Sequence, residues 1–180
     1  MRGELLRRVA LAGFALACLA GAAFSMTVGC SGWDPTKPFE RNAPAVDQAI
    51  EDLDAGRPES AEEALTRYLG TGQCGDAGIG LPESVRQKPN GSFDLGLTLF
   101  ALAERYGRRF GEEELGDGGP EDEQQAALRS VEIECALILV QAIGADPTVP
   151  ADLRARARYL AGNLEFLRKR YKDAVAFYDQ

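Results

Sequence analysis

Apolar residues recur at every third or fourth position along most of the chain, and this spacing is typical of amphipathic α-helices. No segment alternates apolar and polar residues for long enough to predict a strand. The pattern predicts six helices, at 45–54, from Ser60 to Leu69, from Ser92 onward, from Glu123 to Gly144, and two after Pro150. Because short turns join the first two helices and the last two, we expect antiparallel hairpins and an all-α fold without a sheet.

Two of the predicted helices begin with capping signals. Ser60 and Glu63 match the S-x-x-E capping box, and Ser92 is placed to cap the helix that follows it. The stretch 70–91 is rich in glycine and proline, and 111–123 carries seven acidic residues among thirteen. We therefore expect a Gly-rich loop at 70–91 and a solvated acidic loop at 111–123.

The N-terminal segment has the three-part pattern of a secretory signal. A basic start precedes an apolar, Ala-rich run from Val9 to Met26, and Gly29 stands directly before Cys30. The stretch from Thr27 to Cys30 resembles a bacterial lipobox, which implies that Cys30 is lipidated and becomes the mature N-terminus. An ordinary cleaved signal or an uncleaved membrane anchor is the alternative.

The lipobox resemblance sets the expected domain organisation and cellular address. We expect a lipoprotein-type signal peptide at 1–29, a tether at 30–43 and a helical domain at 44–180. The domain would face the periplasm of a bacterial cell envelope, held at a membrane by lipid, with the outer membrane favoured over the inner one.

Charge and composition exclude several classes of function. The whole chain has a net charge of −8, and the part after residue 29 carries −10, from 27 acidic and 17 basic residues. Nucleic acid is therefore not an expected partner. The sequence has no histidine, which removes His-dependent triads and weakens the case for zinc. We expect no catalytic residue, no enzymatic activity, no metal and no other cofactor. Small-ligand or Ca²⁺ binding is a further alternative, although the acidic loop lacks the EF-hand spacing.

Two cysteines lie within the predicted helical domain. Cys74 falls in the Gly-rich loop and Cys135 in the long apolar helix. An oxidising compartment would allow them to pair, and closing a loop of about 60 residues would stabilise the fold by about 4 kcal/mol. The alternative is two buried, reduced thiols that act as small apolar side chains.

The C-terminal segment 159–180 resembles a tetratricopeptide repeat. Gly162 would let two helices approach closely, Tyr171 opens the second helix, Ala174 fits between the helices, and Tyr178 makes a bulky contact one turn later. A weaker copy covers 49–69. Repeats of this family recur every ~34 residues, whereas Ala61 and Ala174 are 113 residues apart. The resemblance therefore implies an irregular array of helical hairpins rather than a regular solenoid.

This resemblance implies a surface for binding other proteins. In tetratricopeptide repeats the inner faces of the first helices grip peptide segments, and the matching face here holds Arg156, Tyr159, Asn163 and Phe166. The alternative is that Tyr159 and Phe166 are ordinary packing residues. We expect a lipid-anchored interaction scaffold with protein partners, or a structural component of an envelope complex, with self-association through the C-terminal hairpin left open.

Overall fold

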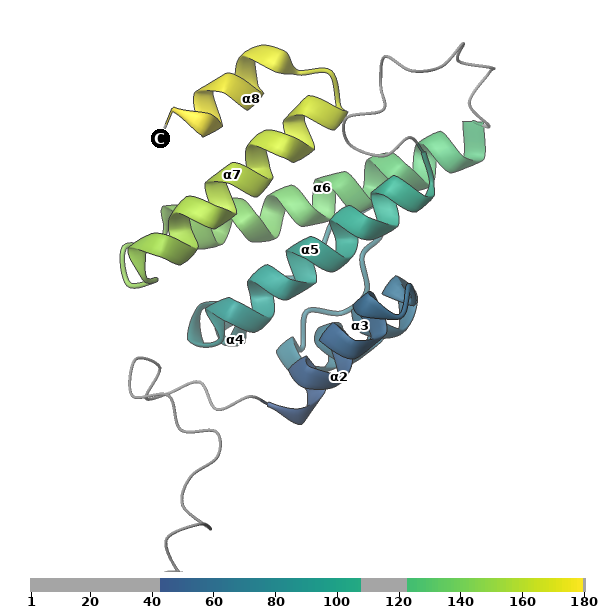
Figure 1. Cartoon of the computed structure of the whole chain (residues 1–180), viewed down its shortest axis with the longest axis vertical. Helices are drawn as coiled ribbons and strands as arrows, with labels where there is room; N and C mark the ends of the chain where they lie inside the picture. Colours follow the sequence, from purple (N-terminus) through teal and green to yellow (C-terminus); the bar gives the residue numbers. More distant parts are fainter. Residues whose placement is uncertain (1–42, 108–122, 180) are drawn as a thin grey trace, which may run out of the picture. The chain divides into compact units, whose positions relative to one another are not determined.

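The computed structural model describes residues 43–107 and 123–179, and most of these residues are helical (Figure 1). The seven helices are α2 (Pro44–Asp54), α3 (Pro58–Leu69), α4 (Glu83–Gln87), α5 (Pro89–Arg105), α6 (Glu123–Ala145), α7 (Ala151–Leu167) and α8 (Tyr171–Tyr178). Among the described residues there is no sheet, only one isolated bridge between Gly75 and Gly78. The predicted all-α class is confirmed.

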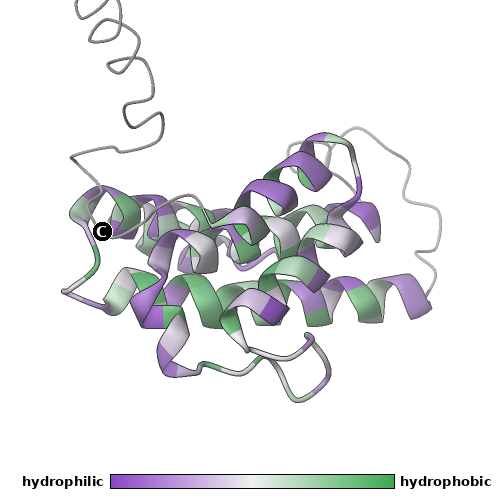
Figure 2. Cartoon of the chain, turned by 90° about the horizontal axis from the view of Figure 1, so that it is seen from below, coloured by the Kyte–Doolittle hydropathy of each residue, from purple (hydrophilic) through white to green (hydrophobic). Residues whose placement is uncertain are grey.

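The core lies between helices that are apolar on one side, and Figure 2 shows green and purple stretches alternating within the same helices. Leucines from four helices are fully buried in it: Leu65 of α3, Leu95 and Leu99 of α5, Leu139 of α6, and Leu164 of α7. Truncating such a residue to alanine typically costs about 2–5 kcal/mol. These leucines therefore hold the hairpins together.

The long helices form three successive hairpins, α2 with α3, α5 with α6, and α7 with α8. The first helix of each later hairpin packs on both helices of the hairpin before it. Thus α5 contacts α2 and α3, and α7 contacts α5 and α6. The same packing step is used twice.

The first and last hairpins are turned by the same hydrogen-bonded motif. In the first turn Gly56 has a φ of 72°, and the N–H of Arg57 donates to the carbonyl of Asp52 over 2.8 Å. In the last turn the residues 113 positions later repeat both features, since Lys169 has a φ of 60° and the N–H of Arg170 donates to the carbonyl of Glu165 over 2.9 Å. The side chains also pair, at 2.5 Å for Arg57 with Asp52 and 4.0 Å for Arg170 with Glu165. The two hairpins are thus built alike.

Both capping predictions are wrong. Helix α3 begins at Pro58, two residues before Ser60, and no side chain caps it. A proline is favoured in a first helical turn because its missing N–H has no partner there. Helix α5 begins at Pro89 for the same reason, and Ser92 is buried inside the helix, where its hydroxyl donates to the carbonyls of Val85 and Lys88.

The Gly-rich segment 70–91 is also more ordered than expected. It contains α4 and the first turn of α5, so only its first part, up to Pro82, is a loop. Val85 of α4 is buried, and the Ser84 hydroxyl donates to the carbonyl of Leu69 at the end of α3. These contacts fix α4 against its neighbours.

The predicted signal peptide, Cys30 and nearly all of the tether lie outside the described residues, as does the acidic loop 111–123 except Glu123, which begins α6. None of the described helices is both long enough and apolar enough to cross a membrane.

Candidate docking surface on the last helical hairpin

The last hairpin depends on a close approach of its two helices. Leu153, Leu160 and Leu164 face the core along one side of α7, and Ala174 of α8 is buried. A Cβ atom added to Gly162 would lie 2.2 Å from Cε1 of Tyr178, so only glycine leaves room for the tyrosine ring. The predicted role of Gly162 as the point of close helix approach fits this geometry.

Four large side chains on this hairpin are exposed to solvent. We call this set the aromatic face; Tyr159, Tyr171, Val175 and Tyr178 are 62, 52, 55 and 41 % exposed. On α8 the three residues are spaced four and three positions apart, which places them on one side of the helix. Ala174 and Phe177 point toward the rest of the domain instead. Helix α8 therefore has apolar side chains on an outer as well as an inner side.

The rings of the aromatic face are held in place by contacts with one another and with neighbouring side chains of α7. The ring centroids of Tyr159 and Tyr178 are 5.5 Å apart, and those of Phe166 and Tyr171 are 5.2 Å apart with edge-to-face geometry. The hydroxyl of Tyr178 donates to Oδ1 of Asn163 over 2.8 Å. Burial, with a smaller contribution from Tyr159, raises the pKa of Tyr178, so this donor keeps its proton at neutral pH. Such pre-positioned rings lose little entropy on binding a partner.

The structure divides the four predicted binding residues. Tyr159, Asn163 and Phe166 come together where α7 meets α8. Arg156 turns toward α5 instead, with its guanidinium 4.7 Å from the ring centre of Phe93. Only Tyr159 and Arg156 are exposed, because Asn163 and Phe166 are half-covered by their neighbours.

A basic turn adjoins the aromatic face. Four of the five residues from Arg168 to Lys172 are cationic. Arg168 pairs with Glu134 of α6 over 2.9 Å, whereas Lys169 and Lys172 point into solvent. Arg170 is exposed in the same turn, and exposed tyrosine and arginine side chains are typical of protein-binding surfaces.

A pocket of about 350 Å³ opens between α6, α7 and α8, on the inner side of α8. Its walls are apolar apart from one amide and one guanidinium, and consist of Val140, Gln141, Gly144, Ala145, Arg158, Ala161 and Phe177. It carries no group of nucleophiles or acids and is large enough for one bulky side chain of a partner.

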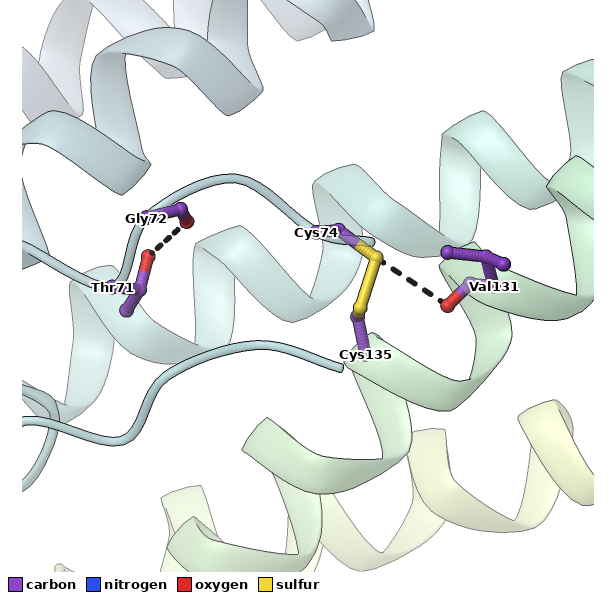
Figure 3. The surroundings of a disulfide bond; sticks show 5 residues. All are labelled: Thr71, Gly72, Cys74, Val131 and Cys135. Carbon is purple, nitrogen blue, oxygen red and sulfur yellow. Dashed lines mark hydrogen bonds between the residues drawn. A yellow bond between two sulfur atoms is a disulfide. The ribbon is translucent and has the colours of Figure 1, made fainter. Parts of the chain in front are cut away.

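Cys74 and Cys135, whose redox state the sequence did not decide, are joined by a disulfide (Figure 3). Their Cα atoms are 6.0 Å apart, and the bond ties the loop after α3 to the middle of α6. The Sγ atom of Cys74 also lies 3.4 Å from the carbonyl oxygen of Val131. Because an oxidised sulfur carries no hydrogen, this contact becomes a hydrogen bond only when the thiol is free.

Sequence reasoning missed a pair of acids beside the disulfide. The pKa of Glu132 on α6 is raised from 4.5 to about 7. Burial is the larger cause, and the nearby carboxylate of Glu62 on α3 is the smaller one. Burial likewise raises the pKa of Glu62, although the N–H of Cys74 donates to it and opposes the change. Oε2 of Glu132 is buried without a hydrogen-bond partner in the described part of the chain. No sequence signal could have linked two acids 70 positions apart.

The described residues contain no group of three or more His, Cys, Asp or Glu side chains that could hold a metal ion. Comparison of the chain with protein-family models, with curated proteins and with solved structures gave no match.

Proposed function

We propose that this protein is a lipid-anchored scaffold of a bacterial cell envelope, which binds other proteins through the outer surface of its last helical hairpin. The observation that carries the proposal is the aromatic face, four large exposed side chains gathered on α7 and α8. Single exposed apolar residues are common on protein surfaces, but a contiguous group beside cations marks an interaction site.

The lipid anchor is tested by metabolic labelling with a fatty-acid analogue. The wild-type chain should incorporate the label and Cys30→Ala should not. Equal labelling of both chains would remove the anchor from the proposal.

Protein binding is tested in living cells with a photoreactive amino acid at Val175, in the centre of the aromatic face. The matched control carries the same group at Gln73, which is exposed in the loop after α3. Illumination should give protein adducts at Val175 that are missing at Gln73. Identical adduct patterns at the two positions, or none at Val175, would contradict binding at this surface.

A further inference from the structure

The packing order of the hairpins defines what would fit on the aromatic face. Each first helix packs on both helices of the preceding hairpin, as α5 does on α2 and α3, and α7 on α5 and α6. One more step of the same kind would place a helix across α7 and α8. The exposed residues lie on these two helices, with Tyr159 on α7, and Tyr171, Val175 and Tyr178 on α8. The occupant that this surface fits is therefore an amphipathic α-helix.

The net charges of the hairpins indicate which kind of amphipathic helix would bind to the aromatic face. The last hairpin, from Ala151 to Tyr178, has seven basic and three acidic residues, a net charge of +4. The first hairpin, from Pro44 to Leu69, has seven acidic and two basic residues, a net charge of −5. The two ends of the hairpin series are thus electrostatically complementary, and complementary surfaces favour association and fix its orientation.

Helix α2 has the features that the occupant needs. It is the first helix of its hairpin, the role that α5 and α7 play at the observed steps. Its outer side is acidic, with Asp47, Glu51 and Asp54 exposed, and Ile50 beside them is 43 % exposed. A large apolar residue flanked by acids matches tyrosines flanked by lysines.

The basic turn gives independent support. Lys169 has a φ of 60°, a backbone conformation that favours glycine, and the equivalent turn of the first hairpin has Gly56 there. A strained lysine where the same motif elsewhere uses glycine indicates that its charge has a role.

We propose that a second copy of this chain docks on the aromatic face, with its α2 lying across α7 and α8 of the first copy. The proposal rests on the scaffold function above and names its partner. Because different surfaces of the two copies meet, the contact is head-to-tail and can repeat, so short chains of copies form rather than a closed dimer.

The test uses two charge-reversed forms of the full chain, purified in mild detergent and followed by sedimentation velocity. The tail variant carries Lys169→Glu and Lys172→Glu, and the head variant carries Glu51→Lys and Asp54→Lys. The new charges suit the helix ends where they stand, acidic near the start of α8 and basic near the end of α2, so both variants should fold. Circular dichroism verifies this.

The wild-type mass should rise steadily with concentration, and its association should weaken at least about tenfold from low to high salt, because screening weakens charge pairs. Each variant alone should associate at least about tenfold more weakly, since its two docking surfaces carry like charges. An equimolar mixture should restore association, because each reversed surface then meets its complement.

Two results would overturn self-docking: a wild-type chain that stays monomeric, or a mixture that fails to regain association. If either occurs while Val175 still crosslinks to a different protein, the scaffold function stands without a second copy as its partner. If the Val175 crosslinks are also missing, the scaffold function fails with it.

Discussion

Reducing the disulfide between Cys74 and Cys135 should cost about 4 kcal/mol of folding free energy. The bond joins residues 61 positions apart, so it closes a long loop in the unfolded chain. Constraining a loop of that length removes about 14 cal/mol/K of unfolded-state entropy, which corresponds to about 4 kcal/mol at 25 °C.

Reduction isolates this effect better than mutation does. Cys135 is fully buried, so replacing it with alanine adds a packing loss of about 1 kcal/mol to the loss of the crosslink. In the reduced protein both sulfur atoms remain, and the Cys74 thiol gains a hydrogen bond to the carbonyl of Val131, whose oxygen is 3.4 Å away. The two sulfur atoms must separate to van der Waals distance, so the folded state adjusts locally around Cys135, and the larger part of the measured difference belongs to the unfolded chain.

The assay is urea unfolding of the wild-type chain with and without a thiol reductant, after thiol titration has verified each redox state. With a denaturant slope of about 2 kcal/mol per molar, reduction should lower the midpoint by about 2 M urea. The matched control is Cys74→Ala combined with Cys135→Ala, which should unfold at the same urea concentration in both conditions.

A loss below about 1 kcal/mol, with the bond verified beforehand, would refute the reasoning. It would mean that the unfolded chain already holds the loop after α3 close to α6, so that the crosslink removes little freedom. A reductant effect on the double-alanine control would instead place the redox-sensitive step elsewhere in the chain.

Three further substitutions test polar groups within the fold. Glu132→Gln removes a carboxyl whose pKa is raised from 4.5 to about 7, so the stability of the wild-type chain falls as the pH rises through that range. The full pKa shift corresponds to ~3 kcal/mol, but because the side chain is half exposed, the variant should be more stable by only about 1 kcal/mol. Urea unfolding should show this gain at about pH 8 and not at about pH 4. Lys169→Gly should stabilise the fold by about 0.5–1 kcal/mol, and Gly56→Lys in the equivalent turn should destabilise it by as much. Urea midpoints equal to that of the wild-type chain would exclude backbone strain at these positions. Glu165→Leu should raise the free energy of unfolding by about 1 kcal/mol, because the carboxylate is buried whereas Arg170 stays hydrated; a lower free energy of unfolding would show that their pairing is net favourable.

The helical pattern was predictable because it rests on many residues at once. The stripe of α7 or α6 repeats over several turns, and no single exception changes the period. Helix α4 could not be found this way, since it has five residues and one buried side chain, Val85. Its position depends on contacts with α3 and α5, which become visible only in three dimensions.

The predicted starts of α3 and α5 were wrong because of local signals that compete. A capping serine and a first-turn proline are competing local signals, and the sequence held both at each start. Helix α5 begins at Pro89 because Ser92 lies three residues inside the helix, where its hydroxyl donates to the carbonyls of Val85 and Lys88 instead of capping the first turn. That bond fixes α4 to α5, an advantage that the local sequence does not reveal.

The candidate site was predictable only in part. The resemblance to a repeat family singled out Tyr159, Asn163 and Phe166, which the structure brings together. The exposed side formed by Tyr171, Val175 and Tyr178 was not predicted, because the resemblance assigns Tyr171 to the start of the second helix and Tyr178 to a contact between the helices. Helix α8 has apolar residues on two sides, and only the tertiary packing determines which side faces the core and which is exposed.

Two costly features meet at the last hairpin, and together they favour binding over stability as the reason for its composition. Lys169 adopts a left-handed conformation that a glycine would relieve, and the aromatic face leaves large rings in water. Lys169 and Val175 are exposed, so polar replacements there would leave the core intact, whereas the ring of Tyr178 packs over Gly162 and contributes to the hairpin. Exposed apolar and strained residues that the core does not need, such as Val175 and Lys169, support the proposed binding surface.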